Sequence, residues 1–231
     1  MVFHSGQGAS YFGKNLNNIS LINNNSYASH NGSLLMPSGI QAGDLLLVSN
    51  TAGSGGASTP TITVLPGLNF TLISSVTGTY SISTSFYRQT SVMSYKIANG
   101  TEGGTTISSF TTSTVSSAIL FHLRGNVKIN SVTNTTTVNT AIATDPPGYV
   151  AATTTGNALE IPYYMNGASK SVPSMVTSPT PFATNIADAG IYASLAAGIW
   201  TSIYSASSYT FDSADGGNMN TIIGGKLVLS N

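Results

Sequence analysis

Hydrophobic and polar residues alternate along much of the chain with the period of a β-strand. From Tyr80 to Tyr87, residues of one parity are mostly aromatic or β-branched, and those of the other parity are mostly serine. Met93, Tyr95 and Ile97 repeat this alternation. Successive side chains of a strand point to opposite faces, so each run predicts a strand with one buried and one exposed face.

Other runs are apolar on both parities. Residues 45–48, 118–123 and 226–229 are short and rich in branched side chains, so they predict central strands buried on both faces. The stretch 186–202 suits a two-faced strand or a hairpin better than a helix. A short helix that begins after Asp188 is the alternative for this stretch.

Turn residues punctuate these runs at intervals of about ten residues, and no amphipathic helix with a cap at each end is evident. Many short strands without intervening helices predict an all-β fold, an antiparallel β-sandwich of jelly-roll type. We expect an irregular, Asn-rich N-terminal arm over residues 1–33 and a single sandwich domain over 34–231. Long loops are expected at 50–60, 133–139 and 166–185.

The chain is almost uncharged, with seven basic and seven acidic residues among 231 and a formal net charge of zero. Charged residues make up 6% of the chain, whereas serine, threonine and asparagine make up more than a third of it. A nucleic-acid partner or an anionic membrane surface would require a basic patch, so we expect neither. Because 41% of residues are hydrophobic and the net charge is zero, a folded core is expected rather than disorder.

The chain has no cysteine, which excludes disulfides, thiolate nucleophiles and cysteine-based metal centres. The first residues lack the charged start and apolar stretch of a signal peptide. The most apolar window, 189–200, is far shorter than the roughly 20 residues of a membrane helix. We therefore expect a soluble protein.

Sequence patterns for common catalytic sites are weak. Residues 8–15 approach the phosphate-binding loop in spacing, but Asn15 stands where a magnesium-binding hydroxyl belongs, so a simple turn is expected. Serine catalysis requires a histidine base, and the chain has three histidines, His4, His30 and His122. His122 lies within an apolar run, which favours a hydrogen-bonded strand histidine.

The acidic residues are few and scattered, and most are expected at turns and strand ends. They are Asp44, Glu102, Asp145, Glu160, Asp188, Asp212 and Asp215. A glycosidase would need two of them in one groove. The segment 212–218 has two carboxylates but lacks the regular alternation of a calcium loop, so a hairpin turn is expected there. We expect no metal and no cofactor.

Aromatic residues are the remaining candidates for a binding surface. Tyr163, Tyr164, Trp200 and Tyr204 could stack on a glycan or contact a protein partner, because their rings combine an apolar face with a polar group. The alternative is that these residues fill the core of the sandwich.

Four segments of the first half of the chain carry recognisable motifs. They are a Gly43-Asp44 pair before an apolar strand, a Pro66-Gly67 segment ending in Thr71, a Tyr95-Lys96 strand, and an apolar strand that ends in Arg124-Gly125. Together they resemble a β-sandwich module of tailed-bacteriophage virion proteins. The resemblance spans residues 35–125, with a weaker similarity over 146–231. At Leu68-Asn69 the chain departs from the module, which often has a tryptophan there. The module occurs in head decoration proteins, head fibres and tail fibres.

This resemblance implies a non-enzymatic virion structural protein, foremost a decoration, cement or knob subunit on the head surface. The implied partners are other virion proteins, either capsid or tail subunits, and further copies of the chain. The alternative is a tail-fibre or spike tip that binds a host surface glycan. The low charge fits a subunit held in an assembly, since few charges give little repulsion between free copies.

Overall fold

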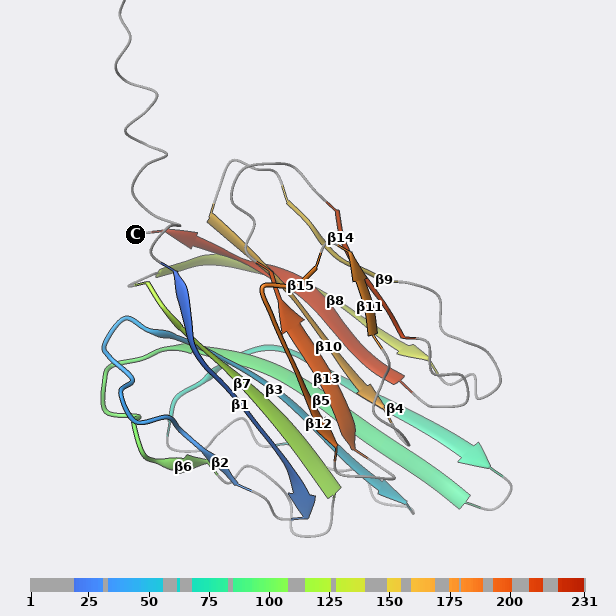
Figure 1. The fold of residues 1–231 in the computed structure, drawn as a ribbon. Helices are drawn as coiled ribbons and strands as arrows, with labels where there is room; N and C mark the ends of the chain where they lie inside the picture. Colours follow the sequence, from blue (N-terminus) through green and yellow to red (C-terminus); the bar gives the residue numbers. More distant parts are fainter. Residues whose placement is uncertain are drawn as a thin grey trace, which may run out of the picture.

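The protein consists of β-strands joined by turns and loops, as a computed structural model shows (Figure 1). The structure describes residues 19–30, 33–55, 62, 68–82, 85–107, 115–125, 128–139, 149–154, 159–168, 175–178, 180–188, 193–200, 208–213 and 220–230. These residues form fifteen strands and contain no helix. In particular, the described ranges hold no helix that is long and apolar enough to cross a membrane. The prediction of an all-β, antiparallel, sandwich-like fold is confirmed.

The first sheet has five strands, and every neighbouring pair in it is antiparallel. In spatial order they are β1 (Ser20–His30), β7 (Val115–Arg124), β3 (Leu45–Gly55), β5 (Ser85–Ile97) and β4 (Thr71–Ile82). A short pair, β2 (Leu34–Leu35) with β6 (Thr106–Ile107), lies beside this sheet. The strands β1 and β4 are therefore the two edges of the first sheet.

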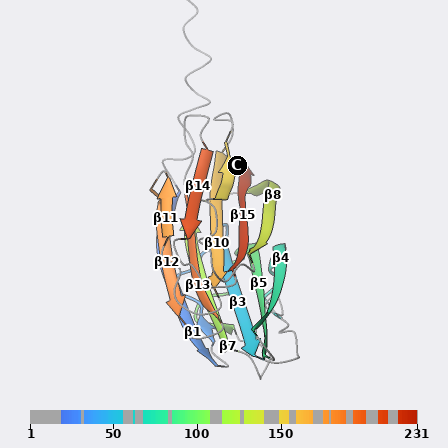
Figure 2. The same cartoon turned by 90° about the vertical axis from the view of Figure 1, so that its right-hand side faces the viewer.

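The second sheet packs against the first and also has five strands (Figure 2). In spatial order they are β12 (Ala183–Asp188), β13 (Ser194–Ile199), β10 (Leu159–Ala168), β15 (Asn220–Ser230) and β8 (Lys128–Asn139). A third sheet covers its outer face and contains β11 (Met175–Ser178), β14 (Ser208–Ser213) and β9 (Tyr149–Thr153). The molecule is thus a sandwich with an additional layer.

The main core lies between the first two sheets. Leu45 and Leu47 of β3 point into it, together with Phe121 of β7 and Leu227 of β15. Leu46 and Val48 point to the opposite face of β3, where they join a second apolar cluster beneath the β2–β6 pair. This alternation confirms that β3 is a central strand buried on both faces.

The expected irregular arm is wrong for residues 20–30, which form the edge strand β1. The strand pairs with β7 from Ser20, opposite Arg124, to His30, opposite Val115. The apolar residues at the start of β1 help to hold it in place, because Leu21 packs against the main core. Residues 1–18 lie outside the described residues. That residues 34–231 form one domain stays a prediction.

All three of the expected long loops contain regular strands. Residues 133–139 belong to β8, and residues 50–55 complete β3. The third loop, 166–185, includes the end of β10, all of β11 and the start of β12. In β8 the segment 133–137 is rich in threonine, whose β-branched side chain suits a pleated surface even where large apolar residues are absent.

Two antiparallel strands flank residues 189–192, so the prediction of strands rather than a helix is confirmed for the described part of the stretch 186–202. Residues 189–192 themselves lie outside the described residues. Strand β12 pairs with β13 from Ala183, opposite Ile199, to Asp188, opposite Ser194. The run 80–87, by contrast, is not one strand. It is divided between β4 and β5, which pair Ile82 with Ser85.

Candidate functional site

The most elaborate loop structure in the described residues covers one end of the first sheet. We call residues 36–44, 68–70 and 98–105 the cap. All five described residues with a left-handed backbone lie in it, namely Gly39, Gly43, Asn69, Gly100 and Gly104. Backbone hydrogen bonds join its segments, from Met36 N to Thr105 O at 2.8 Å and from Gly43 N to Ala98 O at 2.9 Å.

Asp44 is the first anchor of the cap and is only 2% exposed. Its Oδ2 accepts a hydrogen bond from the Gln41 amide at 2.8 Å and lies 2.6 Å from His122 Nε2. Arg124 donates from Nε to Oδ1 and from Nη2 to Oδ2, each at 3.2 Å. Arg124 Nη2 also donates to Gly39 O at 2.8 Å. The carboxylate thus ties the cap to the end of strand β7.

The surroundings of Asp44 keep its carboxyl group ionised. Burial by itself acts to raise the pKa, because desolvation disfavours the charged form. The hydrogen bonds from Arg124, His122 and the Gln41 amide outweigh burial and hold the pKa below its ordinary value of 3.8. At neutral pH the cap is therefore held by a charged group.

Glu102 is the second anchor and is fully buried. Lys96 Nζ lies 2.8 Å from its Oε1, and the backbone amides of Asn99 and Gly100 donate to the carboxylate at 3.1 and 3.0 Å. Lys96 also donates to the carbonyl oxygen of Leu68. Burial acts to raise the pKa of Glu102, but the Lys96 ammonium and the Asn99 amide hold it below the ordinary value of 4.5. Glu102 therefore closes the 98–105 segment.

His122 and Asp44 resemble two members of a catalytic triad, but both side chains are buried. His122 is fully buried, and its second nitrogen, Nδ1, has no hydrogen-bond partner in the part of the chain that the structure describes. The prediction of a hydrogen-bonded strand histidine is confirmed at Nε2. Neither His4 nor the side chain of His30 belongs to the described residues.

Each acidic side chain that the structure describes is paired with a basic one. Besides Asp44 and Glu102, Glu160 lies 2.5 Å from Lys226 Nζ, which also donates to Thr153 O at 2.8 Å. Within the described ranges, no three side chains of metal-ligating type gather. The remaining acidic side chains, the calcium-like segment 212–218 and the phosphate-loop-like segment 8–15 lie outside the side chains described.

The aromatic residues predicted as a contact surface lie in the interior instead. Tyr163, Tyr164 and Trp200 are 0%, 1% and 2% exposed. The Tyr164 ring stacks on Phe211 at 4.8 Å and lies 5.3 Å from the Trp200 ring. The prediction that these three rings contact a glycan or partner is therefore wrong, and the alternative of a core position holds: Tyr163 lies in the main core, and the third sheet covers Tyr164 and Trp200. Tyr204 lies outside the described residues.

Strand alternation sends the two neighbouring tyrosines to opposite faces of the second sheet. Tyr163 enters the main core and donates its hydroxyl to Thr133 O at 3.0 Å. Tyr164 enters the layer below the third sheet, where Gly198 leaves room for its ring because a Cβ there would overlap it. Burial raises the pKa of Tyr164 to about 12 and also raises the pKa of Tyr163. Both hydroxyls therefore stay neutral at physiological pH.

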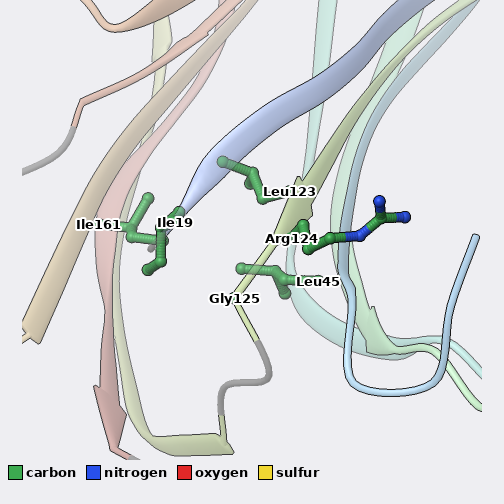
Figure 3. A pocket seen from close by; sticks show the side chains of 6 residues that line it. All are labelled: Ile19, Leu45, Leu123, Arg124, Gly125 and Ile161. Carbon is green, nitrogen blue, oxygen red and sulfur yellow. The ribbon is translucent and has the colours of Figure 1, made fainter. Parts of the chain in front are cut away.

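A small apolar notch lies beside the cap, between the two main sheets. It is lined by Ile19, Leu45, Leu123, Arg124, Gly125 and Ile161. Figure 3 shows the Arg124 side chain extending away from the apolar residues. The notch has about 150 Å³ of empty space, which includes open solvent. Sites for small molecules usually have about 300–1,000 Å³, so the notch is too small for one.

Sequence reasoning did not anticipate the cap as a site, because its anchors are far apart in the chain. Asp44 and Arg124 are joined only by folding, although both stand in the segments that carry the phage-module resemblance. Comparison with protein-family models, curated proteins and solved structures finds no match to the chain.

Chemically, the cap offers a fixed surface of uncharged residues, which ion pairs inside the cap support.

Proposed function

We propose that the chain is a non-enzymatic structural protein of a tailed-bacteriophage virion, a decoration subunit that docks on capsid proteins at the head surface. The proposal begins from the resemblance of residues 35–125 to phage sandwich modules. It is supported by the position of the resembling motifs in the fold. Gly43-Asp44, Lys96 and Arg124 all serve to build the cap.

The observation that carries the proposal is the chemistry of the outer surface of the cap, which we call the cap rim. Its exposed residues are small and uncharged: Ser38, Gly39, Gln41, Ala42, Asn69, Asn99, Gly100, Thr101, Gly103 and Gly104. The charged groups of Asp44 and Glu102 face inward. Such a rim can approach a protein surface closely and hydrogen-bond to it while the carboxylates stay buried, and Arg124, 35% exposed, is the charged side chain that adjoins it.

Docking through an uncharged rim also requires that the cap keep a fixed conformation. The internal ion pairs fix the cap before binding, so little conformational entropy is lost when it meets a partner. A specific interface typically buries about 800 Å² on each partner, and the added contact area would stabilise the junction of neighbouring capsid proteins. The sandwich supplies a rigid platform for this contact.

The experiment is to locate the chain on purified virions by labelling with an antibody and imaging the particles. We expect label on the head, and heat resistance of heads should fall when the chain is absent. Absence of the chain from virions, or label confined to the tail, would contradict the proposal. Equal heat resistance of heads with and without the chain would reject the cement role.

A matched pair of variants tests whether the cap rim makes the contact. Ser38→Lys combined with Gln41→Lys places two charges on exposed positions of the rim, and we expect head occupancy to fall about tenfold or more. Thr184→Lys, at an exposed position of β12, should leave occupancy unchanged. Equal occupancy for all three proteins would show that another surface docks.

A further inference from the structure

Strand β8 is an exposed edge of the second sheet. It pairs with β15 along its length, from Lys128 opposite Ser230 to Asn139 opposite Asn220, and β15 is its only neighbour within that sheet. Figure 2 shows β8 at the border of the second sheet, near β4 of the first. The five consecutive residues Thr133–Thr137 are all exposed, and on the inner face Asn134 Nδ2 donates to Ile73 O of β4 at 3.0 Å.

The middle of β8 lacks the features that usually protect an edge strand. Edges are commonly blocked by lysine, proline or a bulge, since their free backbone groups can pair with another chain. The stretch Ser131–Asn139 has no charged residue and no proline. The irregularity in its pairing with β15 lies before this stretch, between Ile129 and Ser131. Nine residues of β8 are therefore unprotected.

The same stretch is nearly palindromic about Thr135, which suits pairing with itself. If two copies run antiparallel with Thr135 opposite Thr135, Val132 lies opposite Val138 and Thr133 opposite Thr137. Asn134 then lies opposite Thr136. Pairs of β-branched residues and of threonines stabilise neighbouring strands, and no like charges oppose each other.

The two faces of the strands also agree in this arrangement. Val132 packs against the main core, so Val138 and the other even-numbered positions share its face of the sheet. Every proposed pair joins two residues of the same parity. Core-facing residues of one copy are therefore opposite core-facing residues of the other copy, and outward-facing residues are opposite outward-facing ones.

We propose that β8 pairs antiparallel with β8 of a second copy of this chain, about a two-fold axis at Thr135. The second sheets of the two copies then form one continuous sheet. A two-fold contact uses the same edge on both copies, so it closes and leaves neither β8 open for further growth. The inference concerns the chain itself and does not depend on a role in a virion.

Disulfide cross-linking tests both the pairing and its register, because the full chain has no cysteine of its own. Directly opposed residues have Cα atoms about 4.5–5.5 Å apart, which a disulfide can span. With oxidised glutathione, Thr135→Cys should give a covalent dimer. Thr133→Cys alone should not, but a mixture of Thr133→Cys and Thr137→Cys chains should. Ser75→Cys, on the exposed edge strand β4, is the control and should give no covalent dimer, although its β8 strands still pair.

Opposed charges give an independent test by sedimentation of the full chain. Thr133→Lys with Thr137→Lys places lysines opposite lysines and should raise the dimer dissociation constant about tenfold or more. Thr133→Lys with Thr137→Glu places lysine opposite glutamate and should restore dimerisation.

Three results would overturn the inference. The first is a parent chain that stays monomeric at all concentrations or pairs only with a different protein. The second is cross-linking of Ser75→Cys as efficient as that of Thr135→Cys. The third is equal dissociation constants for the two lysine-containing double variants.

Discussion

The cap and strand β8 both face solvent, but they differ in where charge is placed. In the cap, two buried carboxylates are held by Lys96, Arg124 and His122, and they fix the loops from inside. In β8, the five exposed residues Thr133–Thr137 are all uncharged. The described carboxylates thus serve internal structure, whereas the two surfaces proposed for contact, the cap rim and residues 133–137, consist of uncharged residues.

The difference matters because the two regions should respond oppositely to substitution. Removing a buried charge leaves its former partners unsatisfied, which costs several kcal/mol. Changing an exposed strand residue usually alters folding stability by less than about 0.5 kcal/mol. The cap should therefore control folding, and β8 should control association with little effect on folding.

The largest expected effect is that of Asp44→Asn, which removes the charge that binds Arg124 and the cap. We expect the free energy of unfolding to fall by about 1–3 kcal/mol, since the hydrogen bonds to the buried carboxylate lose their charge while Arg124, 35% exposed, keeps contact with water. Urea denaturation followed by tryptophan fluorescence measures it, because Trp200 is the single tryptophan and is buried. A loss below about 0.5 kcal/mol would contradict the role given to Asp44.

A smaller effect is expected from acid. The pKa values of Asp44 and Glu102 lie below their ordinary values of 3.8 and 4.5 in the folded protein. As the pH falls, the unfolded chain therefore takes up protons first. The stability from both groups is present above the ordinary values and is lost as the pH falls through the lowered ones.

The double variant Asp44→Asn with Glu102→Gln is the matched comparison for this acid effect. Its free energy of unfolding should be lower at neutral pH but should decline less below about pH 5 than that of the parent. Denaturation curves across this range measure the difference. Parallel decline in both proteins would assign the acid sensitivity to other groups.

A still smaller effect on folding is expected at the β8 edge. Thr133→Lys should change the free energy of unfolding of the monomer by less than about 0.5 kcal/mol, because the residue is exposed and its change leaves no buried group unpaired. Measurement at high dilution separates folding from association. A loss comparable to that of Asp44→Asn would remove the proposed contrast between the two regions.

Much of the fold follows from local pattern. Alternation and apolar runs predict β3 and β7, because burial on two faces requires apolar residues at both parities. Edge strands are less covered by neighbouring elements, so more of their side chains can be polar. This is why β1, with its asparagines, and the threonine-rich end of β8 are hard to recognise from sequence.

The candidate sites depend more on distant contacts, which sequence does not reveal. The Tyr164 and Trp200 rings would suit an exposed binding surface as well as a core. They are buried because the third sheet covers them. Its strands come from three separate segments of the chain. The cap likewise requires Asp44 to meet Arg124, although the phage-like motifs mark both residues.

The central claim is that copies of the chain associate through uncharged residues. The salt dependence of self-association tests it most directly. Salt at about 0.5 M screens charge interactions far more strongly than salt at about 0.05 M, but it hardly affects hydrogen bonds between uncharged groups. Sedimentation at both concentrations should give dimer dissociation constants that agree within about twofold. Weakening of about tenfold at the higher salt concentration would show that charges hold the copies together and would contradict the account.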